Sequence, residues 1–141
     1  MHKDIAMLRV PATERARFQK GSVLVEFAII LPLFLALLFG VISFSVALYN
    51  KTVLNAATRE GARAGILYVA GQDNDDKETI ANAAAMQVLQ GNLISFGSAM
   101  TPAVTASING DILTVTASGN FMGIFVFSDM SLSAQTSMRI E

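Results

Sequence analysis

The sequence predicts an α+β protein in which a long N-terminal helix crosses a membrane and carries a small C-terminal domain. Three observations predict this fold. The segment from Phe27 to Asn50 is 24 residues without a charge, which is long enough to span a bilayer as a helix. A helical pattern continues beyond it to about Val69, and from residue 103 the apolar residues alternate as in strands. We therefore expect three segments, residues 1–21, 22–70 and 71–141.

Composition and charge narrow the class of protein. Of the 141 residues, 52% are hydrophobic, which indicates that part of the chain lies in lipid. Residues 1–21 carry five basic and two acidic side chains, whereas residues 22–141 carry five basic and nine acidic ones. Close to the apolar segment, four basic residues precede it (Arg9, Arg15, Arg17 and Lys20) and three follow it (Lys51, Arg59 and Arg63), which predicts a cytosolic N-terminus and a C-terminal domain in the periplasm or outside. The lack of a basic domain argues against a nucleic-acid partner.

The chain has no cysteine, and its single histidine is His2. If the first segment is removed as a leader, neither residue type remains for zinc binding or for activating a nucleophile. We therefore expect no enzyme activity, no cofactor, no metal and no small-molecule substrate.

The uncharged segment is apolar on all sides, unlike the core helix of a soluble domain. As a helix it is about 36 Å long, against about 30 Å for the hydrocarbon core of a bilayer. We expect one helix from about Ser22 to about Val69, kinked at Pro32, crossing the membrane to about Asn50 and ended by Gly71.

A second helix is predicted after the acidic segment 73–78 (DNDDKE), which supplies a cap and first-turn carboxylates. The segment lacks the ligand spacing of a calcium loop, so capping is the favoured interpretation. The helix ETIANAAAMQVLQ should be closed by Gly91 and Asn92. Its expected apolar side is Ile80, Ala84 and Val88, with Ala85 and Leu89.

A small antiparallel sheet is predicted for the remainder. AVTASI and DILTVTAS flank Asn109-Gly110, a hairpin signal in which both turn residues need positive φ. The last eleven residues, SLSAQTSMRIE, alternate without a break and indicate a strand with one buried face. Residues 121–127 (FMGIFVF) fit either a strand or a loop.

The entrance to the apolar segment reads Lys20-Gly21-Ser22-Val23-Leu24-Val25-Glu26. A carboxylate at the centre of a spanning helix costs about 2.5–3.5 kcal/mol on insertion scales, and less near an interface. Glu26 could simply snorkel to the headgroups. Alternatively, cleavage after Gly21 would make Ser22 a free α-ammonium group, which could pair with Glu26 within one subunit or between neighbours.

A short basic leader ending in Gly21, a small residue at Ser22, and Glu26 ahead of an apolar helix resemble the class III signal of type IV pilin-like proteins. The resemblance implies a type IV pilin-like fold and a prepilin peptidase that cuts between Gly21 and Ser22. Flp-type major pilins usually carry Tyr where this chain has Phe27, and they are much shorter. Both differences favour a minor pilin.

A small-residue stripe follows the apolar segment, with Ala57, Gly61 and Gly65 at steps of four. Arg59 and Arg63 lie beside the stripe, and Glu60 can pair with Arg63 at a spacing of three. This face could be a solvated basic surface. Two helical glycines cost about 1 kcal/mol each unless packing uses them, so we expect a surface where a helix of another subunit packs during assembly.

REGAR, which follows an E-F-A-x-x-L-P opening, resembles the TadE-like family. The resemblance implies a minor pseudopilin of the Tad/Flp adhesive pilus in the bacterial inner membrane. Its implied partners are the prepilin peptidase, major and minor pilins, the inner-membrane assembly platform and membrane lipid. Two alternatives stay open: a secreted protein cut near residues 45–47, and a membrane-anchored periplasmic binding protein that keeps its leader.

Overall fold

The computed structural model describes residues 12–67, 71, 73–98, 100–124 and 129–140, with side chains from Gly21 onward. The chain forms two compact units, residues 1–37 and 38–141. Helix α1 (Ala12–Ile66) runs through both units. The second unit adds α2 (Asn74–Leu89), β1 (Ala103–Asn109), β2 (Ile112–Phe121) and β3 (Met130–Arg139). The predicted α+β fold with a long N-terminal helix is confirmed.

Helix α1 begins at Ala12 rather than near Ser22. The sequence of residues 12–20 (ATERARFQK) is rich in good helix formers and lacks Gly and Pro, so nothing in it stops a helix before Gly21. The helix ends at Ile66, and the expected end at Val69 lies outside the described residues. Gly71 adopts a φ of 87° in the turn that follows. Pro32 lies inside α1, and the kink expected there stays a prediction.

Helix α2 starts at Asn74, earlier than expected, because the acidic segment forms its first turn as well as its cap. The Asp76 backbone N–H donates to Asp73 Oδ1 at 2.9 Å, and the Asp73 N–H donates to Asp76 Oδ2 at 3.4 Å. This reciprocal pair is a capping box. At the other end Gly91 has a φ of 77° and Asn92 Nδ2 donates to the Val88 carbonyl at 2.7 Å, so the predicted stop is confirmed.

The three strands form one antiparallel sheet in the order β1-β2-β3. The predicted hairpin is confirmed, but its turn lies one residue later than expected. Asn109 pairs with Ile112, and Gly110 takes a φ of 61° as the first central residue. That is the position where a type II′ turn places glycine, so Asn109 can remain in the strand.

Strand β3 confirms the alternation expected in the C-terminal segment, with Ala134 buried and its neighbours Ser133 and Gln135 exposed. Of the ambiguous apolar run, Phe121 is fully buried at the end of β2. Residues 122–124 form no strand, and residues 125–127 lie outside the described residues.

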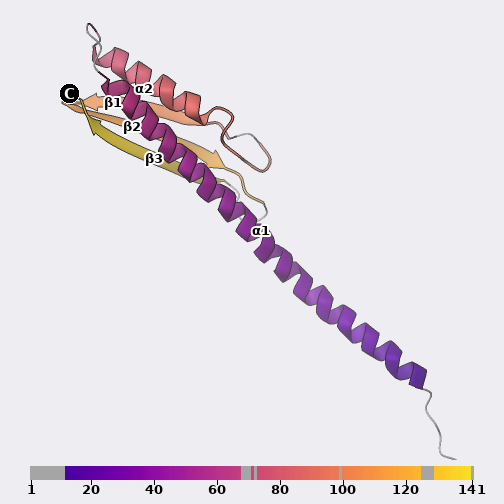
Figure 1. Ribbon diagram of the computed structural model, residues 1–141. Helices are drawn as coiled ribbons and strands as arrows, with labels where there is room; N and C mark the ends of the chain where they lie inside the picture. The colour runs from indigo at the N-terminus through magenta and orange to yellow at the C-terminus, as the bar shows by residue number, and fades with distance from the viewer. Residues whose placement is uncertain (1–11, 68–70, 72, 99, 125–128, 141) are drawn as a thin grey trace, which may run out of the picture. The chain divides into compact units, whose positions relative to one another are not determined.

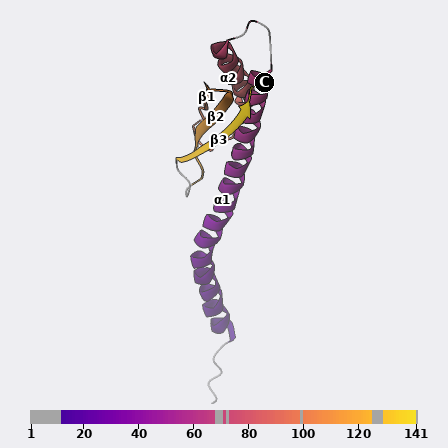
Figure 2. The same cartoon turned by 90° about the vertical axis from the view of Figure 1, so that its left-hand side faces the viewer.

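In the second unit, one face of the sheet is covered by α2 and by the C-terminal half of α1 (Figures 1 and 2). The core consists mainly of small side chains, which let the helices come close to the sheet: Leu54, Ala57, Ala62, Ala81, Ala85, Leu89, Ala106, Leu113, Val115, Ala117 and Ala134. Helix α2 buries Ala81, Ala85 and Leu89, whereas Ile80 and Ala84 are only half-buried. The expected apolar side was therefore wrong by about one residue, because Ala81 and Ala85 are residues of α2 that lie against Gly61 and Gly65 of α1.

Candidate functional site

The expected processing site lies inside α1. Gly21 and Ser22 are both exposed, and a Cβ atom added at Gly21 would meet nothing within 4 Å. Glu26 is exposed as well, and it takes part in none of the ion pairs among the described residues. Of the side chains that the structure describes, from residue 21 onward, none neutralises the carboxylate of Glu26.

The helix around Glu26 exposes large apolar side chains on all its sides. Those between Val23 and Leu37 are 38–72% exposed: Val23, Leu24, Val25, Phe27, Ile29, Ile30, Leu33, Phe34, Leu35 and Leu37. Among the described helices, only α1 is long and apolar enough to cross a membrane. Such a surface is stable in lipid or against other apolar helices, and it is unfavourable in water.

The small-residue stripe lies in the second unit, where α2 of the same chain occupies it. A Cβ atom at Gly61 would come within 2.7 Å of the Ala81 carbonyl oxygen and 2.9 Å of the Ala85 methyl group. At Gly65 it would meet the Ala81 methyl group at 2.9 Å. The glycines are thus needed for the close approach of α2 to α1. We expected a helix of another subunit at this stripe, and the structure places an internal helix there instead.

The charged residues beside the stripe remain accessible. Arg59 is exposed, and Arg63 forms a bidentate pair with Glu60, with Nη2–Oε1 at 2.8 Å and Nε–Oε2 at 3.1 Å. The hydrogen bond from Arg63 lowers the pKa of Glu60, and the same contact raises the pKa of Arg63. The pair is exposed, so it sets the local charge pattern and adds little stability.

Sequence reasoning missed three buried polar residues on α1. Asn50 accepts from the Ile94 N–H at 3.0 Å and donates to the Ile94 carbonyl at 2.6 Å. Ser43 Oγ accepts from the Ile124 N–H at 3.0 Å, and Thr58 Oγ1 lies 2.9 Å from Thr136 Oγ1. Ser43 and Asn50 are seven residues apart, so they lie on one face of the helix two turns from each other. This spacing of polar residues in an otherwise apolar segment could have predicted them.

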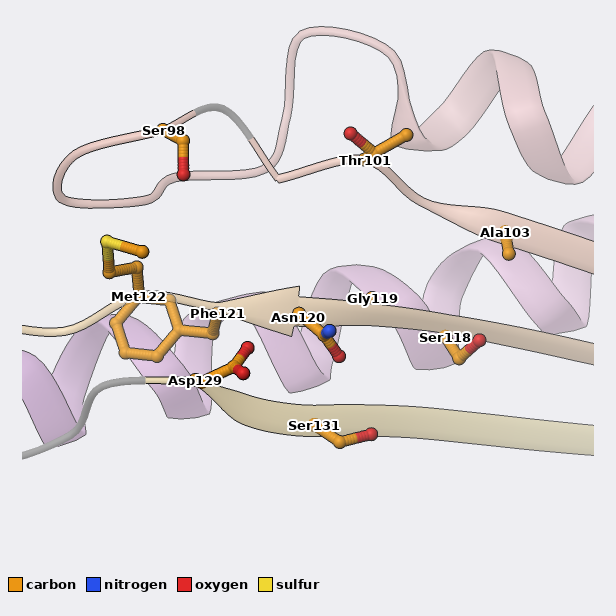
Figure 3. Close-up of a pocket in the computed structure, with 10 residues that line it drawn as sticks. All are labelled: Ser98, Thr101, Ala103, Ser118, Gly119, Asn120, Phe121, Met122, Asp129 and Ser131. Carbon is orange, nitrogen blue, oxygen red and sulfur yellow. The ribbon is translucent and has the colours of Figure 1, made fainter.

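A polar cavity of about 380 Å³ lies at one end of the sheet, between β2, β3 and the loop before β1 (Figure 3). Hydroxyl and amide groups line it, with Asp129 as its one carboxylate. The lining contains no basic side chain to attract an anion, and the described residues include no cluster of three metal-ligating side chains. The cavity can form hydrogen bonds to a small neutral group, and nothing in it is arranged for chemistry.

Comparison with known families bears on the first half of the chain. Residues 21–63 match the family model described as TadE-like protein. The chain contains a TadE-like segment. The resemblance seen in the sequence is confirmed over this range. No curated protein and no solved structure matches the chain.

The TadE-like segment includes the expected processing site, Glu26, the whole apolar surface and the Glu60–Arg63 pair. It is consistent with a TadE-like protein of the Tad pilus system, and it suggests an association with the pilus and its components. The one apolar helix suggests a membrane anchor. Helix α2 and the sheet lie beyond the matched residues.

Proposed function

We propose that this chain is a minor pilin that works by packing and has no catalytic role. A prepilin peptidase cuts it between Gly21 and Ser22 on the cytosolic side of the inner membrane. The mature subunit then joins other major and minor pilins, through the inner-membrane platform, in the initiation, assembly or tip complex of a Tad-type adhesive pilus. The C-terminal unit faces the periplasm before assembly.

The observation that carries this proposal is the surface of residues 21–37. It combines an exposed Gly-Ser bond, an exposed carboxylate at Glu26 and a continuous apolar helix within the TadE-like segment. Lipid satisfies the apolar side chains but not the carboxylate, whereas a neighbouring helix with a free N-terminal ammonium group satisfies both. A subunit that moves from membrane to filament needs this combination.

The bond to be cut lies within a helix, which affects how a peptidase can reach it. Cleavage requires the backbone around Gly21 to leave the helical conformation. Glycine lowers helix stability by about 1 kcal/mol relative to alanine, so it favours local opening at this bond. Glycine is also the small residue that this class of peptidase is expected to need just before the bond.

A membrane-anchored periplasmic binding protein with an uncut leader is the second candidate. The polar cavity at the end of the sheet is the observation in its favour, since a binding domain needs such a site. The two candidates differ in the N-terminal residue of the protein in the cell, Ser22 for the pilin and Met1 for the anchored binding protein.

The experiment expresses Gly21→Leu and Gly40→Leu in cells that contain the peptidase, and measures the mass of the membrane-extracted chain. Gly40 is a matched control, because an added Cβ there also meets nothing within 4 Å. We expect the natural chain and Gly40→Leu to begin at Ser22, and Gly21→Leu to keep its leader. A natural chain that begins at Met1, or Gly21→Leu protein already trimmed to Ser22, contradicts the proposal.

A further inference from the structure

In the second unit, α1 has two different faces between Val41 and Asn50. Ser43, Ala47 and Asn50 are buried, and they follow one another at helical spacing. The opposite face exposes large side chains: Val41, Ile42, Phe44, Leu48 and Tyr49. Ser45 on this face donates its hydroxyl to the Val41 carbonyl at 2.8 Å, which satisfies the group without water. This face is therefore suited to lipid.

Two loops cover the buried face, and we call residues 93–97 and 122–124 the base loops. They bind α1 at Ser43 through Ile124 and at Asn50 through Ile94. These two attachment points are seven residues apart, or about 10 Å along the helix. The loops thus lie beside a part of α1 that the sequence assigned to the membrane span.

The base loops have the composition of a membrane contact. Residues 79–110 contain no charged residue, and Ile94 and Met122 are 47% and 39% exposed. The loops also bind each other: the Phe96 N–H donates to the Met122 carbonyl at 3.0 Å and the Met122 N–H to Ser95 Oγ at 3.3 Å. Backbone groups near lipid need such partners. The charged residues nearby are Asp129, which lines the polar cavity with Met122 (Figure 3), and Lys51, which follows Asn50 and donates to the Ser133 carbonyl.

Charges are instead gathered at the other end of the unit. Helix α2 carries Asp75 and Asp76 in its first turn, and at the hairpin turn Arg139 lies 3.7 Å from Asp111. Met122 follows ten residues after Ile112, so the two are about 33 Å apart along β2. The hairpin end of the unit therefore carries more charged residues than the end at the base loops.

We propose that the base loops insert into the headgroup region of the lipid bilayer and hold the C-terminal unit against the membrane. The hydrocarbon-spanning part of α1 then runs from Ser22 to Ile42, which is about 32 Å and matches a core of about 30 Å. The spanning part of α1 therefore ends at Ile42 and not at Asn50, where we expected its end from the sequence. This inference rests on the membrane anchor alone and not on cleavage or pilus assembly.

Single tryptophan residues can report the depth of the loops, because the chain has no tryptophan. Ile94→Trp and Met122→Trp place the probe on the base loops. Ile112→Trp is a matched control, since Ile112 is 50% exposed at the hairpin end. Each full-length variant is reconstituted in phosphatidylcholine vesicles, with or without lipids brominated along the acyl chains, and tryptophan quenching is measured.

We expect quenching by brominated lipid at residues 94 and 122 to exceed that at residue 112 at least threefold, with blue-shifted emission. Phe96→Trp, a conservative aromatic change, serves as a second probe if the other variants lose the circular dichroism of the natural chain. Quenching at the base loops no stronger than at residue 112 overturns the proposal. Blue-shifted emission without lipid quenching also overturns it, because a protein partner would then cover the loops. Neither outcome depends on whether the chain is cut at Gly21.

Discussion

Replacing Gly61 with alanine tests the contact between the two helices directly. Alanine normally stabilises a helix interior by about 1 kcal/mol relative to glycine. At Gly61 the added methyl group would lie 2.7 Å from the Ala81 carbonyl oxygen. That is about 0.8 Å closer than a comfortable contact of ~3.5 Å. The oxygen belongs to the backbone, so it can move away only if α2 moves.

The expected magnitude follows from these two opposing effects. Overpacking of a tight core typically costs about 1–3 kcal/mol. After the gain in helix propensity, Gly61→Ala should lower the free energy of unfolding by up to about 2 kcal/mol. In a domain of about 100 residues each 1 kcal/mol corresponds to a shift of about 4–8 °C in Tm. Gly61→Leu should be more damaging, because leucine adds further atoms between the helices.

The assay is thermal unfolding of the full chain in detergent, followed by circular dichroism. Gly40→Ala is the control for propensity, since its methyl group would meet nothing within 4 Å. Ala56→Leu is the control for bulk, because Ala56 is exposed on the same helix. If Gly61→Ala is as stable as Gly40→Ala, then α2 does not pack on this stripe, and the stripe would be free for another subunit.

Four further predictions concern polar residues of α1. Asn50→Ala should destabilise the second unit by about 1–3 kcal/mol in thermal unfolding, because both backbone groups of its partner lose a hydrogen bond. The lowered pKa of Glu60 means that its small stabilising effect is present above the usual glutamate value of 4.5 and is lost as pH falls through the lowered value; Arg63→Ala should move that pKa upward in an NMR titration. Glu26→Ala should leave membrane insertion and cleavage intact but reduce the count of surface pili, and normal piliation would make the carboxylate a bystander. Arg59→Glu should reduce co-purification with other pilus components at unchanged Tm, and unchanged co-purification would exclude this face from assembly.

Features that depend on neighbouring residues could be predicted from the sequence. The hairpin, the cap of α2 and its stop at Gly91 each follow from a few adjacent side chains competing for local backbone groups. The errors at these places are shifts of one to a few residues. The turn begins at Gly110 and not at Asn109 as predicted, because one glycine with positive φ is enough to form it.

Features that depend on distant residues could not be predicted. The hydrogen bond from Ile124 to Ser43 joins residues 81 apart, and that between Asn50 and Ile94 joins residues 44 apart. A polar side chain in an apolar helix indicates that it needs a partner, but one sequence does not say which. The glycines pose the same problem, because a stripe for a helix of another subunit and a stripe for α2 have the same composition.

The internal position of α2 changes which part of the chain can serve assembly. A stripe filled by α2 contributes to the stability of the subunit, and opening it would expose Ala81 and Ala85 to water. Within the TadE-like segment, the surfaces left to neighbours are then the apolar helix with Glu26 and the exposed charges at Arg59, Glu60 and Arg63. The apolar helix can pack against many apolar partners, because burial of apolar area is not directional. The exposed charges can discriminate between partners. The minor pilin that we propose needs both in order to join one complex and not another, and both lie on the TadE-like segment.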